Sequence, residues 1–146
     1  MCMAVTRSCT CGDQASLHHT NSVLPEEVVV AVHCPPCSST VEFDPATMVR
    51  DNGWIIEYDM ELATYHLKHY GIEPDKVTPE YVFDEGYSTW NGLTPTDSFD
   101  KAMEMHDLLI ESGGDKRKYF EDMKTWTKER TSKLAEQGWR KAQAAL

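Results

Sequence analysis

The sequence has no long hydrophobic run. No uninterrupted apolar stretch exceeds five residues, the length of Val28–Val32, whereas a helix that crosses a bilayer needs about 20. The first ten residues contain no apolar segment of the kind that directs secretion. We therefore expect a cytoplasmic protein that does not bind a membrane.

Recognisable catalytic motifs are also missing. The chain contains no glycine-rich phosphate loop, no G-x-S-x-G or H-E-x-x-H motif and no dinucleotide-binding fingerprint. Because Asp and Glu are abundant, their presence alone cannot single out a catalytic pair. The sequence consequently names no catalytic residue and favours a protein that is not an enzyme.

Basic residues are scarce: 14 Lys and Arg stand against 24 Asp and Glu, for a formal net charge of −10. A chain with this charge repels phosphate backbones, so we do not expect a nucleic acid partner. The charge is uneven, because residues 73–115 hold 2 basic and 11 acidic groups, whereas residues 116–146 hold 9 basic and 4 acidic groups. This asymmetry fits docking on a protein partner, attraction within the chain, or a solvated helix face.

The cysteines carry the clearest signal, and all five lie within the first 37 residues. Their odd number and the expected reducing cytoplasm argue against a disulfide framework. Two close pairs stand out, Cys9 with Cys11 and Cys34 with Cys37, and 22 residues separate Cys11 from Cys34. Four thiolates in a tetrahedral arrangement are the ligands of a closed structural Zn²⁺ site. The spacing therefore predicts that these four cysteines bind one zinc ion.

The two cysteine pairs, with Gly12 after the first, make residues 7–43 resemble a zinc ribbon. The resemblance implies that each pair lies on a β-hairpin and that the bound metal is structural. Two features depart from the usual pattern: the first pair is C-x-C rather than C-x-x-C, and Ser38 stands where glycine is usual. Zinc ribbons with a C-x-C-G first pair are similar to those of small accessory subunits of larger enzymes, such as carboxylase gamma subunits.

Two other interpretations of the cysteines stay open. A rubredoxin-like iron centre for electron transfer would use the same four sulfurs. A thioredoxin-like dithiol oxidoreductase would use Cys34 and Cys37 alone, and would need a helix directly after the motif. Other residues could add to a site, either near the cysteines or as a separate pair on a helix; these are Cys2, His18, His19, His33, His66 and His69.

The expected fold is α+β, with a small metal-stapled β module followed by a helical region. We expect residues 1–71 to form the β-rich module with a closing helix at 59–70. Because we expect this module to have little core of its own, we expect the metal to replace part of that core. Residues 72–95 are an aromatic-rich irregular connector, and residues 96–146 form a helical hairpin.

Strands are expected at three places in the β-rich module. Glu27–His33 is rich in β-branched residues and predicts a strand covered on both faces. Thr40–Phe43 would be its hairpin partner, and Trp54–Ile56 would form a further strand. Residues 13–25 are polar and are predicted to be a loop.

The helical hairpin is predicted from two apolar stripes. Gly113-Gly114 separates them, and Asp115 is placed to cap the second helix. We expect the two stripes to pack on each other; their members are Phe99, Ala102, Met103, His106, Leu109 and Ile110, and then Tyr119, Phe120, Met123, Trp126 and Leu134. The sequence thus favours a non-catalytic metal-binding accessory or adaptor protein, which docks on a larger protein complex through its helices and its aromatic connector.

Overall fold

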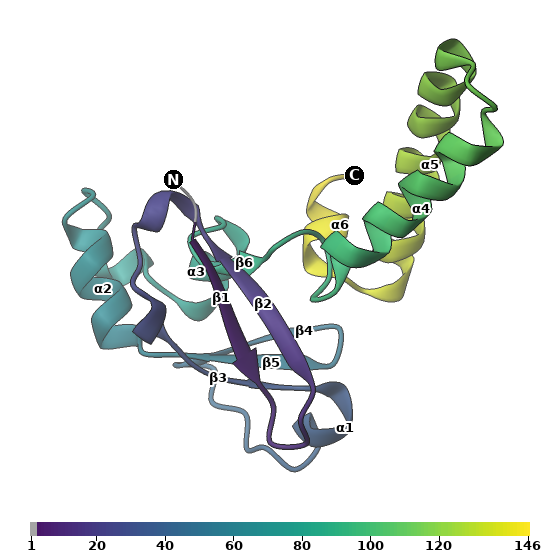
Figure 1. The fold of residues 1–146 in the computed structure, drawn as a ribbon. Helices are drawn as coiled ribbons and strands as arrows, with labels where there is room; N and C mark the ends of the chain where they lie inside the picture. Colours follow the sequence, from purple (N-terminus) through teal and green to yellow (C-terminus); the bar gives the residue numbers. More distant parts are fainter. Residues whose placement is uncertain (1–2) are drawn as a thin grey trace. The chain divides into compact units, whose positions relative to one another are not determined.

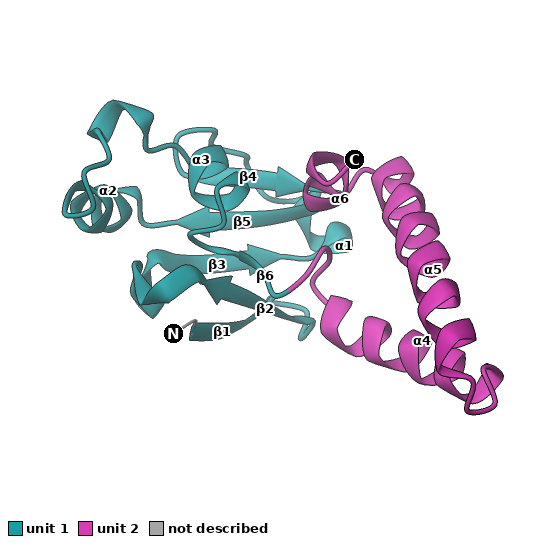
Figure 2. Cartoon of the chain, turned by 90° about the horizontal axis from the view of Figure 1, so that it is seen from above, with its two compact units in different colours: residues 1–91 teal, residues 92–146 magenta. Residues whose placement is uncertain are grey.

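The structure is a computed structural model that describes residues 3–146, and its fold is α+β (Figure 1). The chain consists of two compact units, residues 1–91 and residues 92–146 (Figure 2). Within residues 3–146, no helix combines the length and the apolar character that a membrane span requires.

The first unit contains two three-stranded antiparallel sheets. One sheet is ordered β1 (Met3–Ser8), β2 (Gln14–His19) and β6 (Thr89–Trp90). Along β2, Ala15, Leu17 and His19 are buried while the residues between them are more exposed, so β2 turns one face toward the core. The turn between β1 and β2 contains the first cysteine pair.

The other sheet is ordered β3 (Val29–His33), β5 (Trp54–Tyr58) and β4 (Met48–Asp51). Asn52 and Gly53 join β4 to β5, and both have positive φ, as a tight hairpin turn requires. β3 is an edge strand, and the face that carries Val30 is open to solvent, since Val30 is 53% exposed. The prediction that this strand is covered on both faces is therefore wrong.

Two further strand predictions are wrong. Residues 13–25 were expected to form a loop, but they contain β2. The buried face of β2 includes His19, a residue type that is usually counted as polar. Thr40–Phe43 forms no strand, and β3 pairs with β5 instead, with Val32 opposite Ile56. The strand predicted at Trp54–Ile56 is confirmed as β5.

Short helices complete the first unit. The predicted helix at 59–70 is confirmed as α2 (Met60–Lys68), which begins where the Asp59 carboxylate accepts a hydrogen bond from the backbone N–H of Leu62. α3 (Pro79–Asp84) begins in the same way at Thr78. The remaining helical segments are α1 (Pro35–Ser38) and the 3₁₀ turns η1 (Thr20–Ser22), η2 (Glu26–Val28) and η3 (Pro74–Lys76).

The first unit has a hydrophobic core that the sequence analysis underestimated. Sixteen buried residues from both sheets, α2, α3 and the loops form one cluster. They include two aromatic residues of the connector, Phe83 and Trp90, whose rings meet edge to face with centroids 5.8 Å apart. The connector therefore packs as part of the first unit, and the expectation that this unit has little core of its own is wrong.

The second unit is helical. It contains α4 (Asp97–Glu111), α5 (Lys116–Gln137) and α6 (Arg140–Ala144), and the helical hairpin is formed by α4 and α5. Asp115 caps α5 as predicted, since its carboxylate accepts hydrogen bonds from the backbone N–H groups of Arg117 and Lys118. Gly138 ends α5 in a left-handed conformation, with φ of 104°.

The predicted packing of the two apolar stripes is wrong. Phe99, Met103, Leu109 and Ile110 of α4 are exposed, and so is Phe120 of α5. The periodicity correctly located an apolar face on α4, but that face does not pack on α5. Polar contacts made by Arg130 and Trp126 of α5 link the two helices instead.

Candidate metal centre

The first cysteine pair lies in the turn of the β1–β2 hairpin. Cys9 directly follows β1, and its backbone N–H donates to the carbonyl of Asp13 at 2.7 Å, which closes the turn. The N–H of Gly12 donates to the carbonyl of Cys9 at 2.9 Å. Gly12 has a φ of 101°, a conformation that side chains disfavour. This glycine therefore lets the turn bring Cys11 back beside Cys9.

The second pair lies where β3 leads into α1. Cys34 has an extended backbone and precedes the helix, and its carbonyl accepts the N–H groups of Cys37 at 3.0 Å and Ser38 at 2.8 Å. The two intervening prolines occupy the first helical positions, where no backbone N–H is needed. The short turn thus directs the side chains of Cys34 and Cys37 to the same place.

Arg7 ties the cysteine hairpin to β3, and the sequence analysis did not identify it. Its guanidinium donates to the backbone carbonyls of Val29 at 3.1 Å and Glu26 at 3.0 Å, and it forms an ion pair with the Glu26 carboxylate at 3.3 Å. Because Arg7 is two residues before Cys9, these bonds fix the strand that carries the first pair. A single arginine on a strand gives no sequence pattern that would have revealed this role.

The four predicted ligands are brought together. The Sγ atoms of Cys9, Cys11, Cys34 and Cys37 all lie within 4.8 Å of one another, and the Cys11 and Cys34 sulfurs are 3.2 Å apart. A tetrahedral ion with metal–sulfur bonds of about 2.3 Å separates its sulfurs by about 3.8 Å. The four sulfurs could therefore hold one metal ion after small side-chain movements.

The surroundings of the sulfurs differ in burial and in hydrogen bonding. Cys9 and Cys34 are buried, Cys37 is half-buried and Cys11 is exposed. Backbone N–H groups of Cys11 and Cys34 lower the pKa of Cys9 to about 6, and the Cys34 N–H lies 3.4 Å from the Cys9 sulfur. Burial raises the pKa of Cys34, with a further contribution from the neighbouring Cys11 thiol. The site thus supplies N–H donors that stabilise a thiolate, as metal–thiolate sites do.

The histidines near the cysteines do not join them. In the described part of the chain, the group of potential metal ligands that includes the cysteines contains no histidine. Both ring nitrogens of His19 are engaged, Nδ1 with the Leu24 carbonyl at 3.1 Å and Nε2 with the Ser88 hydroxyl at 3.0 Å. His18 and His33 are half-buried, and neither is part of the cluster. Cys2 lies outside the described residues.

His66 and His69 do not form a second site in the structure. Both rings contact Tyr65 edge to face, with centroid distances of 5.3 Å for His66 and 4.8 Å for His69. Nδ1 of His69 also lies 2.8 Å from the Tyr65 carbonyl. Within residues 3–146, no third potential ligand joins these two histidines in a group that could hold a metal ion.

The helix after the second pair bears on the dithiol interpretation. α1 ends at Ser38, one residue after Cys37, whereas a thioredoxin-like motif opens a long helix. The resemblance to a zinc ribbon implied a β-hairpin at each cysteine pair, but only the first pair lies in a hairpin.

Comparisons with family models, with curated proteins and with solved structures gave no match for this chain.

Proposed function

We propose that Cys9, Cys11, Cys34 and Cys37 bind one structural zinc ion in a zinc-ribbon-like site. The observation that carries the proposal is the convergence of four sulfurs, from two segments separated by 22 residues, to within 4.8 Å. Four thiolates saturate a tetrahedral ion and leave no position open for a substrate, which favours a structural over a catalytic metal.

The metal would fasten the β1–β2 hairpin to the β3–α1 turn. Arg7 already ties β1 to the segment before β3, so the ion would close the free end of the same hairpin. Because the first unit has a core of sixteen buried residues, its folding as a whole does not need the metal ion. Loss of the ion is therefore expected to loosen the hairpin while the core stays folded.

The protein as a whole would be a non-catalytic accessory or adaptor protein that docks on a larger complex. Exposed apolar side chains on α4 and α5 support a docking role for the helices. In the connector, Tyr81 and Tyr87 are half-buried and stacked with ring centroids 5.9 Å apart, and they offer a second contact area. Both features favour protein contact, for which aromatic side chains are well suited.

Metal content tests the central part of this proposal. The full chain, purified without added metal, is expected to hold one zinc per chain by elemental analysis. Cys9→Ser and Cys34→Ser should each lose most of the zinc, and Cys2→Ser, the same chemical change at the fifth cysteine, should retain it. Iron in place of zinc would support the electron-transfer interpretation, and zinc retained by both site variants would refute the proposed ligand set.

The docking role needs a separate test. A tagged full chain purified from its source should carry a partner at constant stoichiometry, and Phe99→Glu or Phe120→Glu should release that partner. Both side chains are exposed, so the substitutions should not disturb the fold. The adaptor role would be contradicted by a chain that purifies without any other protein and whose helices unfold cooperatively with the stability of an independent domain.

A further inference from the structure

The second unit lacks a hydrophobic core of its own. Residues 92–146 are all described, and no large apolar side chain among them is buried. The buried residues of this unit are Thr94, Asp97, Ser112, Ala135 and Ala142. A helical hairpin is stabilised mainly by burial of its apolar face, so this one is incomplete as it stands.

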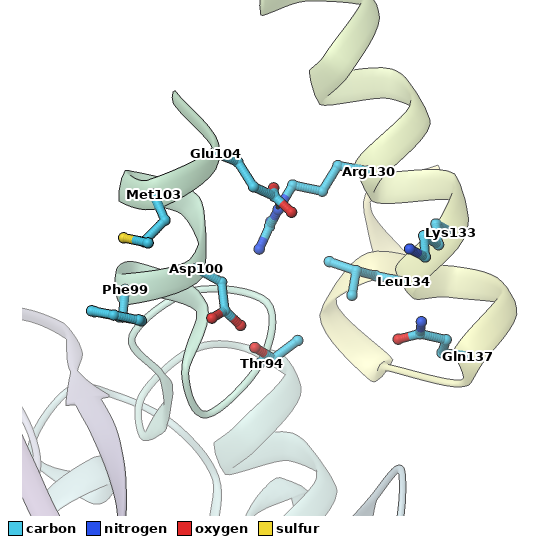
Figure 3. Close-up of a pocket in the computed structure, with 9 residues that line it drawn as sticks. All are labelled: Thr94, Phe99, Asp100, Met103, Glu104, Arg130, Lys133, Leu134 and Gln137. Carbon is cyan, nitrogen blue, oxygen red and sulfur yellow. Dashed lines mark hydrogen bonds and ion pairs between the residues drawn. The ribbon is translucent and has the colours of Figure 1, made fainter. Parts of the chain in front are cut away.

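Polar contacts hold α4 and α5 together. Arg130 of α5 forms ion pairs with Asp97 and with Glu104, the latter at 3.0 Å, and the indole N–H of Trp126 donates to Glu104 at 3.0 Å. Beside these contacts the helices leave a cleft of about 320 Å³, lined in part by Phe99, Met103 and Leu134 (Figure 3). The cleft is also lined by Asp100, Glu104, Arg130 and Lys133, and it gives a side chain from another helix a place to enter between α4 and α5.

We propose that a second copy of this chain completes the hairpin, so that two hairpins form a four-helix bundle. The inference rests on the docking role proposed for the helices and goes beyond it, because it names the first partner. It does not depend on the metal site. Pairing two identical hairpins is the simplest way to bury an apolar face that each copy exposes.

Charge complementarity favours a second copy. α4 carries five acidic residues and one basic residue, whereas α5 carries seven basic residues and four acidic residues. α4 of one copy therefore attracts α5 of the other, and α4 against α4 would bring like charges together. Within residues 92–146 of one copy, all of them described, Arg130 is the one basic residue of α5 that forms ion pairs with α4. The other basic residues of α5 make no ion pair with the described residues of α4 in the same copy.

The spacing of the exposed charges supports the same pairing. Asp100, Asp107 and Glu111 recur on α4 at intervals of 7 and 4 residues, which places them along one flank of the helix. Arg117, Lys124 and Lys128 recur on α5 at the same intervals. The two rows match when α4 of one copy runs parallel to α5 of the other, with Asp107 beside Lys124.

The exposed apolar side chains supply much of the area that a dimer interface buries. Five large side chains of α4 and α5 are each more than half exposed: Phe99, Met103, Leu109, Ile110 and Phe120. At roughly 100 Å² each they supply about 500 Å² per copy, toward the roughly 800 Å² per partner of a stable interface. Half-buried Met105, Leu108 and Met123 would add to this area.

Sedimentation equilibrium of the full chain tests the proposal directly. The expected mass is twice 16.6 kDa, or 33.2 kDa, with dissociation on dilution. Ile110→Glu should raise the dissociation constant at least about 100-fold, because it places a charge in the interface. Tyr65→Glu, which replaces an equally exposed apolar side chain in the first unit, should leave the dimer intact. A mass of 16.6 kDa up to about 1 mM protein would overturn the proposal.

Charge reversal tests the proposed pairing of helices. Asp107→Lys and Lys124→Glu should each weaken their own homodimer about tenfold, because each creates two like-charge contacts per dimer. An equimolar mixture of the two variants should associate as tightly as the wild type, since both contacts become attractive in the heterodimer. Circular dichroism of each variant at 222 nm checks that its helices remain. A mixture no tighter than the separate variants would contradict the α4–α5 pairing.

These outcomes also separate the dimer from the adaptor role. A monomer whose Phe99→Glu variant releases a stoichiometric partner would refute the dimer and leave the adaptor proposal standing. A dimer that purifies without any other protein would support the dimer and count against docking on a larger complex.

Discussion

Residues 1–91 and residues 92–146 treat their apolar side chains in opposite ways. The first unit buries sixteen residues in one cluster, including Leu17, Ile56 and Phe83, which are not exposed at all. The second unit leaves large apolar side chains such as Phe99 and Phe120 exposed and buries an ion pair instead. The first unit therefore has a hydrophobic core that can support independent stability, whereas the second unit has no such core.

Truncation of matched phenylalanines should make this difference measurable. Phe83→Ala should lower the free energy of unfolding of the first unit by about 3–5 kcal/mol, because it leaves a cavity in a filled core. Phe99→Ala should change the stability of a monomer little, because the Phe99 side chain is already 69% exposed. Urea denaturation followed by tryptophan fluorescence measures both. Equal losses in the two variants would contradict the contrast between the units.

The ion pairs of Arg130 should be the next most sensitive feature. Arg130→Met keeps much of the side-chain volume but leaves the buried Asp97 carboxylate without this partner, at a cost of about 3 kcal/mol. In thermal unfolding followed by circular dichroism, the variant should lose its helical signal at a lower temperature than the wild type. Arg117→Met is the matched control, because Arg117 pairs with Glu121 in solvent, so its loss should lower the melting temperature much less than Arg130→Met does. Equal melting temperatures of the two variants would show that the ion pairs of Arg130 do not stabilise the contact between α4 and α5.

Acid should weaken the first unit through His19. Burial lowers the pKa of His19 below its usual value of 6.5, so the ring stays neutral in the folded state while the unfolded chain takes up a proton. The stabilisation is complete above pH 6.5 and declines as the pH falls below it, by at most about 1.4 kcal/mol per pH unit. An NMR titration of the His19 ring signals should give a midpoint below pH 6.5. A midpoint at or above pH 6.5 would contradict this prediction.

The candidate site was easier to predict from sequence than the packing around it. Cys9, Cys11, Cys34 and Cys37 could be grouped because close spacing within each pair limits where the sulfurs can lie. β2 was missed because one of its buried positions is His19, whose polar ring is satisfied by Leu24 and by the distant Ser88. Partners so far apart in the chain leave no local pattern.

The helices illustrate a second limit of sequence analysis. Spacing located α4 and its apolar face, and Asp115 correctly marked the start of α5. Periodicity shows that such a face exists but carries no information about what covers it. In the structure, Asp97 and Glu104 on the more polar side of α4 pair with Arg130 of α5, and no pattern along either helix predicts this arrangement.

X-ray absorption at the metal edge of the purified full chain tests the central claim most directly. The account predicts a zinc ion with four sulfur neighbours at about 2.3 Å and no nitrogen or oxygen ligand. A chain free of metal, or an ion coordinated mainly by nitrogen and oxygen, would contradict it.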